Sequence, residues 1–306
     1  MTLSAILAMM LAAQAGDRVI LFDNANARAK PAADALIVCG ERLGTELRVQ
    51  GREAGWVRVN SCGHDAFIAE RLTRDITDAN RAVMRERLLR ERLARAGENF
   101  SNANYLLFLA ASWASAPAVA RDREAQARYA LYDLQALAAA AAAAEQTGAF
   151  RGEFAGRLGE QSTVLFYNEI GGSWMLRNAH IWAVHDRFSG TKAADDIAWF
   201  AAEHGVGGEC EGYVPCMLSR LDVLAGAYLR RHPAGRHVDA ALTRIAEWLD
   251  FGGKPPDVSD AGLPKGTVCG DAATPLAALR AAITPVSSAL KPRALAPLQQ
   301  VEAACR

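Results

Sequence analysis

The sequence predicts a multidomain protein with a small β-barrel near the amino terminus, followed by an all-α helical bundle or a short helical-repeat domain. Between residues 19 and 72, short apolar runs alternate with polar residues at period two and are separated by glycine-containing turns. After Leu72 the apolar spacing becomes helical, and alanine-rich runs appear. We therefore expect a β-domain at 16–75, a helical domain at 76–250, a Gly/Pro-rich loop at 251–275 and a C-terminal helical segment at 276–306.

Within the predicted barrel, residues 46–49 and 56–59 alternate between apolar and polar side chains, so each is expected to form a strand. Residues 51–55 and 61–65 are rich in glycine and polar residues and are expected to form turns. Short strands at this close spacing suggest a small barrel.

Four segments of this region follow one another in a characteristic order. They are Asn26-Ala27-Arg28-Ala29-Lys30-Pro31, Leu43-Gly44-Thr45-Glu46-Leu47-Arg48-Val49, Gly55-Trp56-Val57-Arg58-Val59, and Ala66-Phe67-Ile68 with Leu72. By their order and spacing, residues 24–72, about one sixth of the chain, resemble a bacterial SH3 domain of the kind found in cell-wall proteins. Ala-Phe stands where that family usually has a second Gly-Trp. The resemblance implies an SH3-like module that binds cell-wall glycan, a peptide or a protein partner.

The candidate ligand-binding residues of this module are two aromatic and two basic side chains. Trp56 and Phe67 offer aromatic faces, and Arg28 and Arg58 offer positive charge for a peptide or glycan strand. The alternative is that both aromatic rings belong to the barrel core, which is where an aromatic residue on a strand is more often found.

The helical region is expected to contain helices at 81–96, 104–114, 123–144 and 163–182. Asp78 is a candidate N-cap for the first of these helices, and Gly148 is a candidate C-cap after the third. Residues 186–197 and 230–241 form a faint repeat with an offset of 44, which is typical of stacked helical hairpins. The second copy, at 228–249, resembles tetratricopeptide-like hairpins, although an irregular bundle fits nearly as well.

The six cysteines fall into three pairs that are local in sequence. These are Cys39 with Cys62, Cys210 with Cys216, and Cys269 with Cys305, one of 15 possible connectivities. The last pair would tie the 251–275 loop to the C-terminal segment. Disulfides persist in oxidising compartments, which favours a periplasmic or secreted protein.

The first fifteen residues carry no charged side chain and contain a short apolar run. Ala13-Gln14-Ala15 fits the small-x-small pattern of a signal peptidase site, so a signal peptide at 1–15, cut after Ala15, is predicted. The alternative is a buried first helix. The run is too short to span a bilayer, and no transmembrane span is expected in the mature chain.

Composition narrows the partner classes. Lys+Arg and Asp+Glu both total 34, so the net charge is zero, and nucleic acid is not an expected partner. No metal site is predicted, because His180 and His185 are five residues apart and do not share a helix face as i,i+4 ligands do. No cofactor is predicted, since neither a phosphate-binding glycine loop nor a dinucleotide fingerprint occurs.

Two functions remain open at this point. One is a non-catalytic envelope protein, whose SH3-like module binds peptidoglycan or an envelope protein while its helical domain serves as an interaction scaffold. The other is a peptidoglycan-active enzyme of lysozyme type, which needs an acidic residue with a raised pKa. Glu169, before Ile170-Gly171-Gly172, is the candidate acid, provided that its surroundings are apolar.

Overall fold

The computed structural model describes residues 18–96, 122–147, 164–252, 254, 256, 258 and 263–306. The predicted signal peptide, the predicted helix at 104–114 and the candidate cap Gly148 lie outside these residues. The chain divides into two compact units, Met1–Arg95 and Ala96–Arg306.

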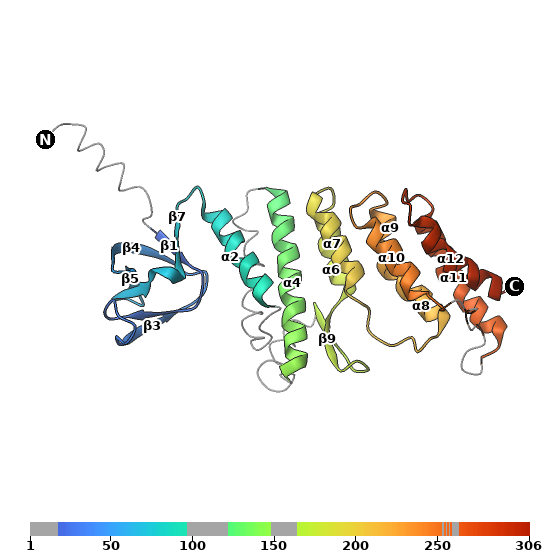
Figure 1. Ribbon diagram of the computed structural model, residues 1–306, viewed down its shortest axis with the longest axis horizontal. Coiled ribbons are helices and arrows are strands. Elements are labelled where there is room, and N and C mark those ends of the chain that lie inside the picture. Colours follow the sequence, from blue (N-terminus) through green and yellow to red (C-terminus); the bar gives the residue numbers. More distant parts are fainter. Residues whose placement is uncertain are drawn as a thin grey trace, which may run out of the picture. The chain divides into compact units, whose positions relative to one another are not determined.

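The first unit is built on an antiparallel sheet (Figure 1). Its strand order is β3-β2-β6-β5-β4-β1-β7. The strands are β1 (Arg18–Leu21), β2 (Ala25–Arg28), β3 (Ile37–Glu41), β4 (Glu46–Glu53), β5 (Trp56–Ser61), β6 (His64–Ala69) and β7 (Thr73–Ile76), with a 3₁₀ turn, η1 (Glu70–Leu72), before β7. The predicted β-domain is therefore present. Its pairing begins at β3 and ends at β7, so the described strands do not close into the predicted barrel.

The long strand β4 is shared by two halves of the sheet. Its first residues pair with β1 and its last residues pair with β5, and the register shifts between Val49 and Gly51. Apolar side chains from both halves contribute to one core, which includes Val19, Val59 and Ile68, each fully buried. The alternation that the sequence shows is thus the alternation between this core and the opposite face.

The two hairpins β4–β5 and β5–β6 have two-residue turns. Ala54 and Gly55 form one turn and Cys62 and Gly63 the other, and all four residues have positive φ. Positive φ at both central residues is the type I′ geometry that matches strand twist, and it favours glycine at the second position. The first turn is shorter than predicted, because β4 continues to Glu53.

Helix α2 (Arg81–Ala96) follows the sheet at the residues predicted. Arg81 and Arg85 both pair with Glu46 of β4, and Leu88 is 1% exposed. Thr77 and Asn80 exchange side chain–backbone hydrogen bonds of 2.7 and 3.3 Å before the helix. This reciprocal pair corresponds to a capping box, so Thr77, and not Asp78, provides the capping contact. Because α2 packs against the sheet, the first unit ends at Arg95 and not at residue 75.

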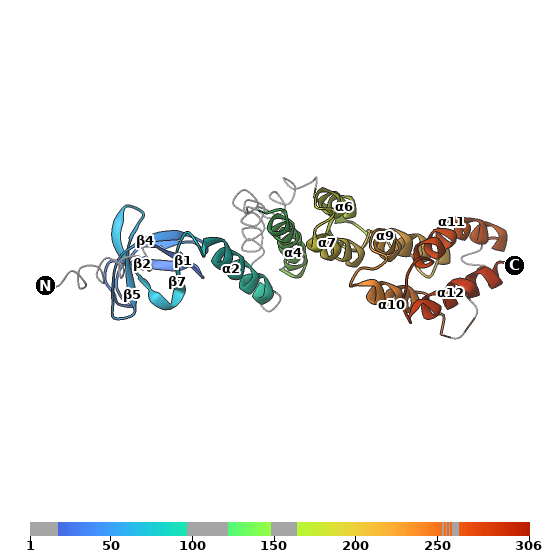
Figure 2. The ribbon, with the colours of Figure 1, turned by 90° about the horizontal axis from the view of Figure 1, so that it is seen from above.

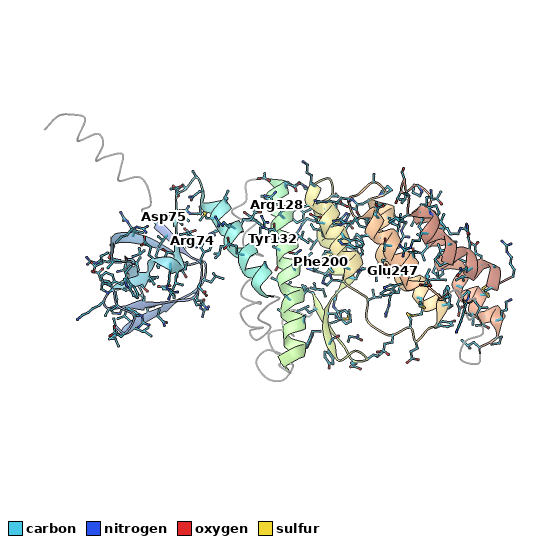
Figure 3. All side chains as sticks on the ribbon, in the orientation of Figure 1. Arg74, Asp75, Arg128, Tyr132, Phe200 and Glu247 are labelled. Atoms are coloured by element: carbon cyan, nitrogen blue, oxygen red, sulfur yellow. A yellow bond between two sulfur atoms is a disulfide. The ribbon has the colours of Figure 1, made fainter. Side chains whose placement is uncertain are left out.

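The second unit is mainly helical, and its hairpins follow one another side by side in chain order (Figures 1 and 2). It contains α4 (Arg123–Thr147), β8 (Leu165–Asn168), β9 (Ser173–Leu176), α6 (Asn178–Arg187), α7 (Lys192–Glu203), α8 (Val214–Leu221), the π-helical turn η3 (Asp222–Gly226), α9 (Ala227–Arg231), α10 (Val238–Trp248), α11 (Lys265–Ile283) and α12 (Lys291–Ala304). Figure 3 labels Arg128 and Tyr132 on α4, Phe200 on α7 and Glu247 on α10. The two copies of the faint repeat are the hairpins α6–α7 and α9–α10.

Two predictions about this unit are wrong. The segment 163–182 is not one helix, because β8 and β9 form a hairpin before α6 begins at Asn178. The loop expected at 251–275 ends early, because α11 begins at Lys265 and includes Pro275. The helix predicted at 123–144 is confirmed as α4, which extends to Thr147.

The three disulfides join the predicted pairs, Cys39–Cys62, Cys210–Cys216 and Cys269–Cys305. The third bond does not tie a loop to a helix, since Cys269 lies on α11 and Cys305 directly follows α12. It joins the two last helices of the chain. None of the helices in the described part of the chain is both long and apolar enough to cross a membrane.

Candidate binding face of the β-sheet

The four candidate ligand-binding residues lie on one face of the sheet. Arg28 of β2 is opposite Phe67 of β6, and Phe67 is opposite Arg58 of β5. Trp56 is two residues before Arg58 on the same strand. Directly opposed residues, and residues two apart on one strand, share a face, so the four side chains form one surface.

The row through Phe67 crosses five strands. Beyond Arg28 lies Ile37 of β3, and beyond Arg58 lies Gly51 of β4. We call the residues Ile37, Arg28, Phe67, Arg58 and Gly51 the outer row. Ile37 is 48% exposed, and a Cβ atom placed on Gly51 would have no neighbour within 4 Å. The outer row is therefore open to solvent at both ends.

The opposite face of the same strands forms the core. Val57, Val59, Ala66 and Ile68 are fully buried there. Phe67 and Trp56 are only half-buried and do not belong to that core. The alternative that the two aromatic rings are core residues is therefore not what the structure shows.

The two arginines of the outer row are held by local contacts. Arg28 donates from Nη1 to the carbonyl oxygen of Ala35 at 2.6 Å, next to Leu36, which is 75% exposed. Arg58 donates from Nη2 to Oδ2 of Asp65 at 2.5 Å, and this hydrogen bond lowers the pKa of the Asp65 carboxyl. A guanidinium group has five N–H donors, so each arginine retains donors for an anionic group.

The Cys39–Cys62 disulfide fixes the edge strand that carries Ile37. It joins β3 to the β5–β6 turn, and Ser61 donates a hydrogen bond of 2.6 Å to Glu41 of β3. Among the described residues, Cys39, Glu41 and Cys62 are the only group of side chains spaced for a metal ion. The two sulfur atoms are bonded to each other and cannot act as thiolate ligands. The contacts of Cys39 and Glu41 therefore hold strand β3 in place and do not form a metal site.

Glu169 belongs to the second unit and lies in the turn between β8 and β9. Glu169 is exposed, and the adjacent Ile170 is 67% exposed. Glu169 is therefore exposed to solvent, and among the described residues it does not occupy the apolar environment that a general acid needs.

A group of histidines and carboxylates in the second unit was missed by the sequence analysis. His185 at the end of α6 and His232 after α9 approach each other, and Tyr228 donates a hydrogen bond of 2.7 Å to Asp195 of α7. His185 and His232 are 47 residues apart. Spacing within one helix, the pattern that indicates i,i+4 metal ligands, cannot reveal such a pair.

Comparisons of the chain with protein-family models, with curated protein sequences and with solved structures gave no match. The resemblance of residues 24–72 to a bacterial SH3 domain therefore stays a prediction. It rests on the order and spacing of the residues in this sequence.

Proposed function

We propose that this protein is an exported envelope protein whose β-sheet unit binds the peptide-bearing polymer of the cell wall along the outer row. The observation that carries the proposal is the register that brings Arg28, Phe67 and Arg58 side by side on the face opposite the core. The three disulfides of the protein are compatible with an oxidising compartment. The helical unit then serves as a scaffold for a protein partner.

The chemistry of the outer row favours an extended ligand with carboxylates. Guanidinium groups form strong, charge-assisted hydrogen bonds to carboxylates. Phe67 and Trp56 provide half-buried aromatic surface between and beside the two arginines, and Gly51 leaves space at one end. A wall polymer that carries short peptides presents both carboxylates and apolar groups, so it matches both features.

Glycan cleavage is not proposed. Glu169, the acid suggested by the sequence, is exposed at the tip of the β8–β9 hairpin. An exposed carboxyl is hydrated and lacks the apolar enclosure that a general acid of this type needs. No specific observation in the described residues favours a catalytic role over binding.

The proposal is tested by co-sedimentation of the oxidised protein with purified peptidoglycan sacculi across a salt series. We expect Phe67→Ala to weaken binding by roughly tenfold, the effect of removing an interface anchor worth about 1.4 kcal/mol. Arg58→Gln should weaken binding and reduce its salt dependence. Val83→Ala, which removes an exposed apolar side chain of α2 (66% exposed), is the matched control and should bind as the wild type does.

Two results would contradict the proposal. One is that the wild-type protein does not sediment with sacculi at any salt concentration. The other is that Phe67→Ala, Arg58→Gln and Val83→Ala all bind equally well. The supernatants are also analysed for released wall fragments, because their appearance would show that the protein cleaves the polymer.

A further inference from the structure

Two histidines from separate helical hairpins meet in the second unit. His185 lies in the last turn of α6, and His232 follows the end of α9. Their Nε2 atoms are 2.9 Å apart, and the two rings meet edge to face with centroids 5.1 Å apart. We call them the imidazole pair. The side chain of His185 is 7% exposed and that of His232 is 20% exposed, so the contact is largely shielded from water.

The short distance between the two nitrogens restricts their protonation. A hydrogen bond between two Nε2 atoms requires that one carries a proton and the other offers a lone pair. At most one of the two Nε2 atoms is therefore protonated while the contact exists. If both imidazoles become cations, both Nε2 atoms are donors, and the hydrogen bond is replaced by repulsion.

Charged groups on α6, on α7, on α9 and in the turn before α10 lie around the pair. Asp186 of α6 lies 2.8 Å from Nδ1 of His185, and Asp195 of α7 lies 3.6 Å from Nδ1 of His232. Arg231 of α9 and His237, which precedes α10, also act electrostatically on His232. Further out, Arg236 and Asp196 complete the group through contacts to Asp195 and His237.

The net charge of these groups can neutralise one proton added to the pair, but not two. With neutral histidines, the three aspartates and two arginines leave one net negative charge. One proton on the pair cancels this charge and keeps the Nε2 hydrogen bond. A second proton makes the group positive and removes the hydrogen bond.

A metal ion is a poorer explanation for the same geometry. Tetrahedral zinc holds two imidazole nitrogens about 3.3 Å apart, given its bond lengths of about 2.0–2.1 Å. The observed 2.9 Å is a hydrogen-bond distance. Among the described histidines, cysteines and acids, none completes a three-ligand group with this pair.

We propose that the imidazole pair is an acid-sensitive latch between the α6–α7 and α9–α10 hairpins. It joins the hairpins while the pair carries at most one extra proton, and it releases them when both imidazoles are protonated. Tyr228 forms a second connection at the same place, because its hydroxyl donates to Asp195 and accepts from the backbone N–H of His237.

The direction of the pH effect follows from burial. Desolvation lowers the pKa of His232 below its ordinary value of 6.5, and the attraction of Asp195 only partly opposes this. A base whose pKa is lower in the folded state takes up protons on opening. A positive charge on His185 lowers the pKa of His232 further, so His232 takes the second proton of the pair. The stabilisation from the contact is therefore present above pH 6.5 and is lost as the pH falls below that value and through the lowered folded-state pKa of His232.

The test is hydrogen exchange of the full-length protein, followed by mass spectrometry at pH 7.5, 6.5, 5.5 and 4.5 and corrected for the intrinsic exchange rate. Between pH 7.5 and pH 4.5, we expect protection against exchange at the ends of α6 and α9 to fall in the wild type. This fall should be at least tenfold larger than in the double variant His185→Gln, His232→Gln. His204→Gln is the control, because burial also lowers the pKa of His204 but it lies outside the pair. The His204→Gln variant should lose protection on acidification to the same extent as the wild type.

An equal loss of protection in the wild type and the double variant would overturn the latch. If the double variant does not fold, NMR titration of the wild-type imidazoles decides the question. Two protonation steps on the pair, separated by more than one pH unit, are expected for groups that share one proton. Independent titration of both rings with one common midpoint would overturn the proposal.

Discussion

A single residue, Gly235, decides how closely the α9–α10 hairpin can approach the α6–α7 hairpin. Gly235 lies in the turn between α9 and α10. A Cβ atom at this position would lie under 3.0 Å from the Tyr228 hydroxyl, from a carboxylate oxygen of Asp195 and from Cβ of His232. Glycine is required here by the close approach of the hydrogen-bonded groups. Tyr228 is fully buried and cannot move away easily.

We therefore expect Gly235→Ala to destabilise the protein by roughly 1–3 kcal/mol, the usual cost of overpacking. The matched control is Gly270→Ala on α11, where the added methyl group meets nothing within 4 Å. In that exposed helical position alanine should stabilise by about 0.5–1 kcal/mol. Urea unfolding followed by circular dichroism measures both changes. Equal effects of the two substitutions would show that the turn has room that the structure does not indicate.

At the same scale, the sequence alone suggested the four candidate residues of the proposed binding face but not their arrangement. The G-W-x-x-V pattern located Trp56 and Arg58, and alternation placed them together on one face. That Arg28 and Ile37 continue the same row depends on strand register, which is set by turns and bulges far along the chain. For the same reason, the meeting of His185 with His232 was not predictable from local spacing.

Secondary-structure elements were predictable where local pattern and tertiary packing agree. Helix α2 was predicted with its observed bounds, and α4 differs only at its end. In the segment 163–182, the glycines 171 and 172 separate two short runs with aromatic residues, and these runs pair as β8 and β9. This hairpin signal was present in the sequence, but it was outweighed by the helical pattern around it.

Helix α11 shows the opposite case, in which packing overrides propensity. Gly266, Gly270 and Pro275 all disfavour a helix interior. Val268, Ala272, Leu276 and Leu279 nevertheless recur at helical spacing, and all four are buried. Their burial supplies more free energy than the weak helix formers cost, so the glycine and proline content was misleading.

Two of the disulfides should contribute different amounts to the free energy of unfolding. Cys269–Cys305 closes a loop of 36 residues between α11 and α12, whereas Cys210–Cys216 closes a loop of 6. In the chain-entropy description, the longer loop contributes about 4 kcal/mol and the shorter one about 2 kcal/mol. Replacing both cysteines of each bond by serine, in two separate variants, tests this by urea unfolding. Similar losses for both variants would contradict the loop-length argument.

At the scale of the whole molecule, the division into a sheet unit and a helical unit was predicted, but the boundary was not. The change of periodicity after Leu72 marks the end of the strands. It does not show that α2 packs back on the sheet through Glu46 and its two arginines. A boundary between compact units depends on contacts, and the sequence pattern reports only secondary structure.

The proposed export also concerns the whole chain, and it has a direct test. We expect the protein from a bacterial envelope fraction to begin at Gly16, because signal peptidases cut after small-x-small motifs. Mass spectrometry of the N-terminal peptide measures this. A chain that retains Met1 and fractionates with cytoplasmic proteins would contradict both the predicted signal peptide and the proposed location.

The open pairing order of the sheet has a practical consequence for work with the purified protein. In the described part of the chain, β3 has β2 as its one neighbour, and Leu36 and Ile37 beside that edge are 75% and 48% exposed. An edge strand with apolar side chains is a template for pairing with another molecule. Concentrated samples should therefore self-associate along β3, and under the proposed function this association would compete with the wall polymer for Ile37. Apparent affinities should then weaken as the protein concentration rises, so dilute samples give the truer value.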